Sequence, residues 1–280
     1  MVVNARRTLP LLAALACLLG LVGVALLVFD VHAVRERDVA MLHGFVSLDR
    51  PGVHAKFDAL VHLADPLPYA LGGLLCIGIA MARRRGWRAL AALSLLIVTG
   101  VTTQALKHAL AHPRFTTWLG ADKQIDPTSW PSGHSTAAMT LALCAVMVAP
   151  PAWRAVTAVV GGAFAVGVGY AVLVLAWHYP SDVLGGFLVA GFWTSLAIAV
   201  VHRVEAPEPA RRPLWEPLVP LGGVAALAAA AAIGTRSNDV AVYSFERPTL
   251  VVGALAIAAL ALALLVTISA ASTRAAHQAR

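Results

Sequence analysis

Two residues four positions apart, His178 and Asp182, can do nucleophilic or acid–base chemistry together. Pro180, which lies between them, suits the first turn of a helix, so a helix is expected to begin here. A carboxylate at this spacing can bind one imidazole nitrogen and leave the other free as a nucleophile or base. The alternative is that Asp182 only caps the helix, while His178 lies at a membrane surface beside Trp177 and Tyr179.

A second segment, Pro131-Ser-Gly-His134, directly precedes an apolar stretch. Ser132 is a good helix N-cap, and Gly133 allows another group to approach the backbone closely. The N–H groups and the positive dipole end of such a helix suit an anion such as phosphate. His134 lies at the same place and can protonate a leaving oxygen. The alternative is an ordinary capped helix with a histidine at the membrane surface.

A third segment is basic and contains Lys107, His108, His112 and Arg114. Two cations beside a helix end can bind phosphate, Arg114 through two parallel hydrogen bonds. The alternative is a cluster whose charged ends simply reach water at a membrane surface. His108 and His112 have a spacing that can ligate a metal. No acidic or third histidine partner lies near them in the sequence, so no metal and no cofactor is expected.

Together these segments contain the parts needed for phosphoryl transfer. His178 would attack phosphorus, Asp182 would orient it, and His134 would protonate the leaving group. Lys107, Arg114 and a helix N-terminus would hold the negative charge. The expected chemistry needs no metal and passes through a phosphohistidine.

Long apolar stretches must position these residues. Hydrophobic residues make up 59% of the 280 residues, whereas soluble domains have roughly 45–50%. A stretch of about 20 such residues crosses a bilayer as a helix. The expected fold is therefore all-α, a polytopic membrane helical bundle, in which the second, fourth and seventh stretches are short for a span. The eight stretches are Leu9–Phe29, Leu67–Ala82, Trp87–Leu106, His134–Val148, Trp153–Ala176, Val183–Val201, Leu218–Gly234 and Leu250–Ala270.

Three regions are expected along the chain. Residues 1–201 form a six-helix core that carries every candidate site residue. Residues 202–217, which are rich in proline and charge, form a cytoplasmic linker, and residues 218–280 form an appended two-helix hairpin with a short tail. The polar connection 30–66 has apolar residues at helical spacing, which predicts short helices along the membrane surface.

The net charge of +7 is unevenly distributed. If the N-terminus is inside and eight spans follow, the inside segments hold twelve basic and three acidic residues, and the outside segments hold nine basic and eleven acidic residues. Basic residues concentrate on the cytoplasmic side of membrane proteins. The pattern predicts that both termini are cytoplasmic and that the histidine-bearing ends face outside. The membrane topology also explains the positive net charge, so no nucleic-acid partner is expected.

The three segments resemble the motifs of the type-2 phosphatidic acid phosphatase superfamily, which includes lipid phosphate phosphatases, polyprenyl-pyrophosphate phosphatases and soluble vanadium haloperoxidases. The lysine and arginine of its first motif fall on Lys107 and Arg114. The second motif, proline-serine-glycine-histidine, is complete at Pro131–His134. The histidine and aspartate of the third motif are present as His178 and Asp182.

The resemblance implies roles that agree with those argued from the residues. His178 would be the nucleophile, Asp182 its partner and His134 the general acid. The groups that hold the phosphate would be Lys107, Arg114, Ser132 and Gly133. The implied partners are the bilayer and a substrate that is a lipid phosphate or a polyprenyl (pyro)phosphate.

The chain departs from the family pattern in two motifs. Phe115 replaces the proline that usually follows the arginine of the first motif. The third motif normally begins with serine and a phosphate-binding arginine, and here Ala171 and Val172 occupy those positions. A hydrogen bond to a charged group typically contributes about 1.5–3 kcal/mol. Three alternatives stay open: a slow enzyme, an enzyme that uses Lys123 or Arg114 as the replacement cation, or a protein that binds lipid headgroups without turning them over.

The sequence therefore predicts a metal-independent phosphatase that acts on a lipid phosphate or prenyl (pyro)phosphate at the outer face of a bacterial inner membrane. A phosphotransferase with another acceptor would use the same histidine chemistry and stays open as an alternative. A transporter is disfavoured because the titratable residues lie at one face and not near the membrane midplane.

Overall fold

The computed structural model describes residues 5–114, 116, 118–119, 124–205 and 247–272, and these fold entirely into helices and their connections. The helices are α1 (Ala5–Asp30), α2 (His32–Val46), α3 (Pro51–His62), α4 (Pro66–Ala82), α5 (Gly86–Ala109), α6 (Gly133–Val148), the 3-10 turn η2 (Pro151–Trp153), α7 (Arg154–Val174), α8 (Pro180–Val204) and α11 (Pro248–Ser272). The predicted all-α class is confirmed.

Among the described helices, five are long and apolar enough to cross a membrane: α1, α5, α7 with the preceding η2 turn, α8 and α11. Helices α3 and α4 meet this criterion as a pair that is bent by 53°. Helix α6 is apolar but has only 16 residues. Each predicted apolar stretch coincides with one of these helices except Leu218–Gly234, which lies outside the described residues, and the stretch Trp153–Ala176 runs past the end of α7 at Val174. The chain is a multi-pass membrane protein.

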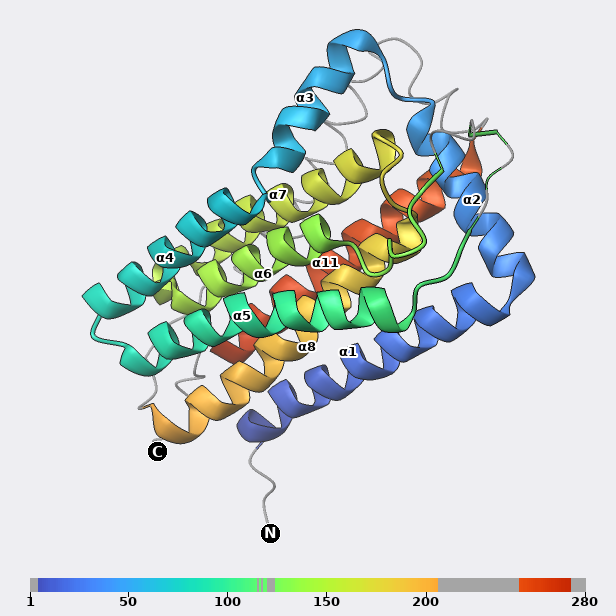
Figure 1. Ribbon diagram of the computed structural model, residues 1–280. Helices are drawn as coiled ribbons and strands as arrows, with labels where there is room; N and C mark the ends of the chain where they lie inside the picture. The colour runs from blue at the N-terminus through green and yellow to red at the C-terminus, as the bar shows by residue number, and fades with distance from the viewer. Residues whose placement is uncertain (1–4, 115, 117, 120–123, 206–246, 273–280) are drawn as a thin grey trace.

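Helices α6 and α8 form the centre of the bundle (Figure 1). Helix α6 packs against α4, α5, α7 and α8, and α8 also packs against α1, α5 and α11. A Cβ atom on Gly186 of α8 would lie 2.8 Å from the carbonyl oxygen of Ser132 and 2.9 Å from Thr136 Oγ1. Small residues let membrane helices approach closely. Gly186 thus allows the first turns of α6 and α8 to lie side by side.

Helix α11 packs into this bundle, against α2, α6, α7 and α8. The Tyr170 hydroxyl on α7 donates a hydrogen bond to the Ala254 carbonyl at 2.7 Å, and Ile257 and Leu265 are fully buried. The described half of the predicted hairpin therefore shares one core with residues 5–205. Most of the predicted linker, residues 206–217, lies outside the described residues.

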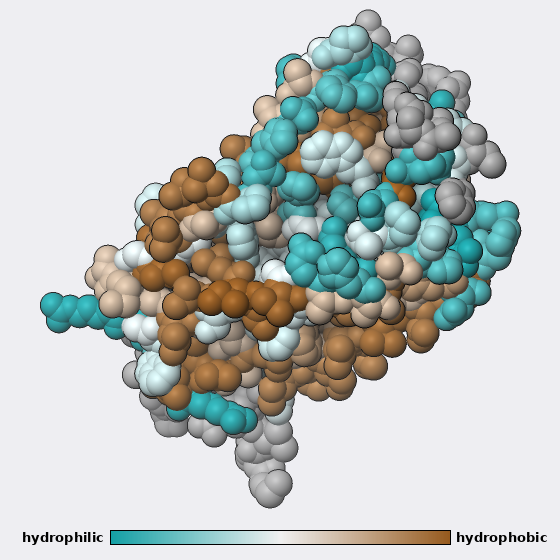
Figure 2. Space-filling model, in the orientation of Figure 1, coloured by the Kyte–Doolittle hydropathy of each residue, from teal (hydrophilic) through white to brown (hydrophobic). Residues whose placement is uncertain are grey.

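Short helices were expected in the connection between α1 and α4, and it contains two, α2 and α3. Helix α2 packs against α7, α8 and α11, and α3 packs against α7. The visible surface is hydrophilic around α2 and α3 and hydrophobic along the flank of the long helices (Figure 2). Large exposed apolar side chains on α1 and α4 include Leu19, Leu26, Leu67 and Leu75. A contiguous apolar surface of this kind suits a lipid environment, and the bundle has one distinctly polar end.

Candidate active site

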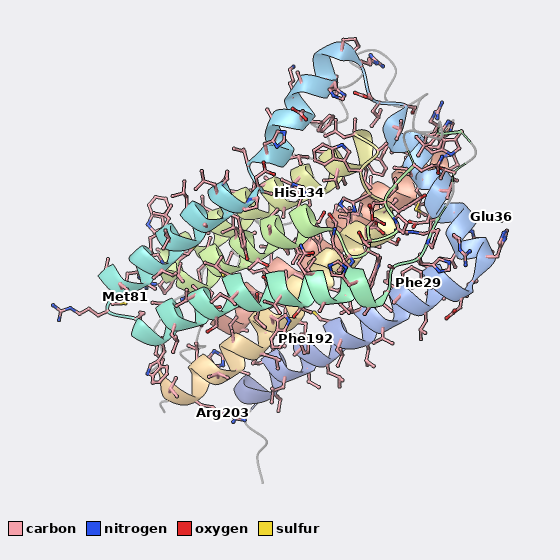
Figure 3. All side chains as sticks on the ribbon, in the orientation of Figure 1. Phe29, Glu36, Met81, His134, Phe192 and Arg203 are labelled. Atoms are coloured by element: carbon pink, nitrogen blue, oxygen red, sulfur yellow. The ribbon has the colours of Figure 1, made fainter. Side chains whose placement is uncertain are left out.

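The three segments that carry the predicted site residues lie together at the polar end of the bundle. The Ser132 N–H donates to the Asp182 carbonyl oxygen at 2.9 Å, which joins the second and third segments. Arg114 of the first segment forms an ion pair with the Asp182 carboxylate. His134 lies at this end of the molecule and Arg203 at the opposite end (Figure 3). The tertiary structure thus brings the two ends of the α5–α6 connection, which carry the first and second segments, against the α7–α8 turn, which carries the third.

The turn between α7 and α8 places His178. Ala176 has a φ of 58°, in the left-handed region. The Trp177 N–H donates to the Val172 carbonyl at 2.9 Å, and the Ala176 N–H donates to the Leu173 carbonyl at 3.1 Å. These two bonds with a left-handed residue form a Schellman motif, which closes the C-terminus of a helix. The chain then reverses and sets His178 against the first turn of α8.

Asp182 caps α8 and orients His178 at the same time. Its Oδ2 atom accepts from the Tyr179 N–H at 3.0 Å and lies 3.2 Å from His178 Nδ1. Its Oδ1 atom accepts from Arg114. The carboxylate is fully buried. Since Nδ1 of His178 is held by Asp182, Nε2 is the nitrogen available as a nucleophile.

Burial lowers the pKa of His178 below its usual value. The hydrogen bond and the charge of Asp182 oppose this effect, whereas the charges of Lys107 and His134 add to it. A lowered pKa keeps the imidazole neutral at neutral pH, as nucleophilic attack requires.

Arg114 is buried, and both of its terminal nitrogens are engaged with protein groups. Its terminal nitrogens donate to Asp38 Oδ2 (3.4 Å), Ser181 Oγ (3.2 Å), Ser129 Oγ (2.7 Å) and Asp182 Oδ1. Its guanidinium carbon lies 4.0 Å from the centroid of the Tyr179 ring, a cation–π contact. Burial acts to lower the pKa of Arg114, but the charges of Asp182 and Asp38 raise it overall. In this arrangement Arg114 positions Asp182, and its terminal nitrogens would have to give up a present hydrogen bond to donate to phosphate.

Asp38 on α2 is a site residue that the sequence analysis missed. Its Oδ1 accepts from the Ser181 N–H at 3.0 Å, and its Oδ2 accepts from the Ser181 hydroxyl at 2.6 Å. Burial raises the pKa of Asp38 to about 6, although the charge of Arg114 acts to lower it. Asp38 therefore ties α2 to the N-terminus of α8. Nothing in the sequence distinguishes it from the other acidic residues of the 30–66 connection.

The N-terminus of α6 is capped and open. The Ser132 hydroxyl accepts from the Ser135 N–H at 3.3 Å, so the predicted N-cap is present. A Cβ atom on Gly133 would meet nothing within 4 Å. Backbone N–H groups that point out of a helix N-terminus bind anions. Apart from its chain neighbours, no described residue therefore fills the side-chain position of Gly133.

His134, next to Gly133, is paired with a carboxylate that the sequence analysis also missed. Its Nε2 atom lies 3.0 Å from Asp65 Oδ1. Its ring centroid lies 5.6 Å from the ring of Trp177, the residue that precedes His178. Asp65 belongs to the break between α3 and α4. The available signal was its place directly before Pro66, where a helix N-cap is expected.

Ala171 and Val172, which occupy the positions of the family's serine and arginine, are fully buried in the apolar core. Phe115 and Lys123 lie outside the described residues. Within the described part of the chain, the predicted phosphate-binding cations are Lys107 and Arg114. The same part contains no group of three or more His, Cys, Asp or Glu side chains that could hold a metal ion.

Comparisons with known proteins agree with the motifs. Residues 88–206 match the family model of the PAP2 superfamily. The structure also matches the crystal structure of the first transmembrane PAP2 type phosphatidylglycerolphosphate phosphatase from Bacillus subtilis, with a TM-score of 0.55 and 22% sequence identity. The match covers 69% of this chain and 97% of that chain, and at this identity it shows a shared fold. No curated protein matches the chain.

Proposed function

Because residues 88–206 match the PAP2 superfamily model and the structure matches that of a transmembrane PAP2 type phosphatase, we propose that the chain is a membrane phosphatase of lipid phosphates. The proposed substrate is a lipid phosphate or a polyprenyl (pyro)phosphate, and the proposed reaction requires no metal. One observation carries the proposal. A buried histidine–carboxylate pair, His178 and Asp182, is joined by a backbone hydrogen bond to the open N-terminus of α6.

In the first step, Nε2 of His178 attacks phosphorus and the bond from phosphorus to the leaving oxygen breaks. His134 donates a proton to that oxygen, because an alkoxide is a poor leaving group. Asp182 holds Nδ1–H of His178 and stabilises the positive charge that develops on the ring. Lys107 and the Gly133 N–H stabilise the phosphoryl oxygens.

In the second step, water attacks the phosphohistidine and gives its proton to His134. The phosphorus–nitrogen bond breaks, phosphate leaves, and His178 is again neutral. The lowered pKa of His178 favours this return to the neutral ring.

We also propose that the site faces outside, in the inner membrane of a bacterium, with both termini in the cytoplasm. Arg83, Arg84, Arg85 and Arg88 lie in and beside the α4–α5 turn, at the other end of α5 from Lys107. Clustered arginines favour the cytoplasmic side. The opposite, histidine-bearing end is then outside.

A second candidate is a protein that binds lipid headgroups without hydrolysing them. Its support is the buried Val172 at the position of the family's arginine, together with the engagement of Arg114 by two carboxylates. A phosphotransferase with an acceptor other than water uses the same first step.

The test is phosphate release by the detergent-purified protein with EDTA present. The substrates are phosphatidic acid, phosphatidylglycerol phosphate, and short prenyl monophosphates and pyrophosphates, with His178→Ala as the control. Release that disappears in the variant supports the proposal and identifies the substrate class. Headgroup binding without release from any substrate would support the binding protein, and release that needs metal would refute metal independence.

A further inference from the structure

We infer that Asp65 is the positioning residue for the proposed general acid His134, so that the active site contains two histidine–carboxylate pairs. The inference rests on the proposed function because it gives Asp65 a part in the same reaction. Asp65 lies outside residues 88–206, the stretch that matches the family model. The carboxylate of the second pair is therefore supplied by the part of the chain that precedes the matched stretch.

Asp65 occupies the N-cap position of α4, yet its side chain makes no capping hydrogen bond. An aspartate at this position normally accepts from an N–H of the helix that follows. Here Oδ1 lies 3.0 Å from His134 Nε2, and Oδ2 lies 2.8 Å from His62 Nδ1. The carboxylate binds two histidines in place of its local partner, and one of them is 69 residues away on α6.

This arrangement assigns the two nitrogens of His134. The Nε2–H donates to Asp65, so Nδ1 is the nitrogen that can exchange a proton with substrate. In the first step the Nδ1 proton passes to the leaving oxygen as the phosphorus–oxygen bond breaks. In the second step Nδ1 accepts the proton of the attacking water. Asp65 keeps the proton on Nε2 throughout, so the neutral ring always has the same tautomer.

The Trp177 side chain also restricts the position of the His134 ring. It packs against His134 with centroids 5.6 Å apart and against His62 with centroids 6.3 Å apart. Because Trp177 directly precedes His178, the contacts of His134 connect the second pair to the backbone of the nucleophile. Side chains that are held on two sides keep the geometry that proton transfer requires.

The test compares leaving groups. Dioctanoyl phosphatidic acid releases a poor leaving group that needs a proton, whereas 4-nitrophenyl phosphate releases a phenolate that leaves without one. We expect Asp65→Asn to lower kcat/KM for phosphatidic acid by about 30–100-fold, since general acid catalysis contributes about 10²–10⁴. For 4-nitrophenyl phosphate we expect less than about a 3-fold change on the same grounds. His134→Gln should show the same selectivity, and Asp65→Glu, which keeps the carboxylate, should restore part of the rate.

Asp49→Asn is the matched control, because Asp49 forms a similar exposed pair with His54 at 3.0 Å, at the start of α3. It should leave both substrates unchanged. The inference would be overturned if Asp65→Asn lowered kcat/KM equally for both substrates, or left kcat/KM for phosphatidic acid unchanged. In either case the activity of the wild type would still support the proposed function. A wild type no more active than His178→Ala on either substrate would instead refute the proposed function, and this inference with it.

Discussion

At the scale of single residues, the site depends on buried charges that neutralise one another. Asp182 lies between a histidine and an arginine, and Arg114 lies between two carboxylates. If one member of such a group is removed, the others stay buried without a partner. The free energy of unfolding then falls by more than it does when a surface ion pair is removed. Two predictions follow from the individual groups.

The first prediction concerns pH. Because burial lowers the pKa of His178, the acid limb of kcat/KM should fall below about pH 6.5, the ordinary histidine value. Activity is lost as pH falls through the lowered pKa, since the protonated ring cannot attack. The unfolded chain binds this proton more readily than the folded one, so folding stability should also decline as pH falls below about 6.5. A pH–rate profile with an acid limb above that value would contradict the prediction.

The second prediction concerns Asp38. Asp38→Ala should lower the free energy of unfolding by about 3 kcal/mol at neutral pH, because Arg114 and the Ser181 N–H each lose a buried acceptor. Asp38→Asn should cost less, since its amide oxygen can still accept from the Ser181 N–H. Thermal unfolding in detergent measures both. Glu36→Gln on the same helix removes an exposed pair with His32 and should change stability by less than about 0.5 kcal/mol. Equal losses for Asp38→Ala and Asp38→Asn would argue against the backbone contact.

At the scale of elements, the active site requires the first turns of α6 and α8 to lie in contact. The Ser132–Asp182 backbone bond crosses this contact, and Gly186 provides the space for it. The helix ends thus set the distance between the proposed anion site on α6 and the nucleophile before α8.

A matched pair of glycine substitutions tests this contact. Gly186→Ala puts a methyl group 2.8 Å from the Ser132 carbonyl oxygen, and overpacking of this kind costs about 1–3 kcal/mol. We expect lower thermal stability and a reduced rate of phosphate release. Gly100→Ala in α5 meets nothing within 4 Å and should be neutral or stabilising by up to about 1 kcal/mol. Equal behaviour of the two variants would show that the helix approach is not constrained.

At the scale of the whole molecule, the fold has two chemically different ends. The site, α2 and α3 lie at one end, and the arginines of the α4–α5 turn lie at the other. The proposed orientation assigns the first end to the outside of the cell. Cys17, Cys76 and Cys144 are free and buried, so an added cysteine can report which side it faces.

Labelling of intact cells with a membrane-impermeant maleimide tests the orientation. Lys56→Cys on α3 should react without permeabilisation, because Lys56 is exposed at the site end. Arg203→Cys near the end of α8 is exposed at the opposite end and should react only after the cells are opened. The unmodified chain, with its buried cysteines, measures the background. The reverse pattern would place the site on the cytoplasmic side.

The membrane bundle and the local parts of the site could be predicted from the amino-acid sequence. Long apolar stretches can satisfy their backbone groups in lipid only as helices. Seven of the eight stretches coincide with described helices, and the eighth lies outside the described residues. Contacts between residues that are close in the sequence could also be predicted. His178 meets Asp182 across 4 residues, and Ser132 caps the helix that follows it.

The distant carboxylates that complete the site could be identified only from the folded chain. Asp38 reaches Ser181 across 143 residues, and Asp65 reaches His134 across 69 residues. Both come from a polar connection in which acidic residues are expected at the surface, so their local sequence carries no sign of burial or pairing. Their partners depend on how α2, α3 and α4 pack against α6 and α8. The same packing commits Arg114 to two carboxylates, a role that its spacing from Lys107 does not reveal.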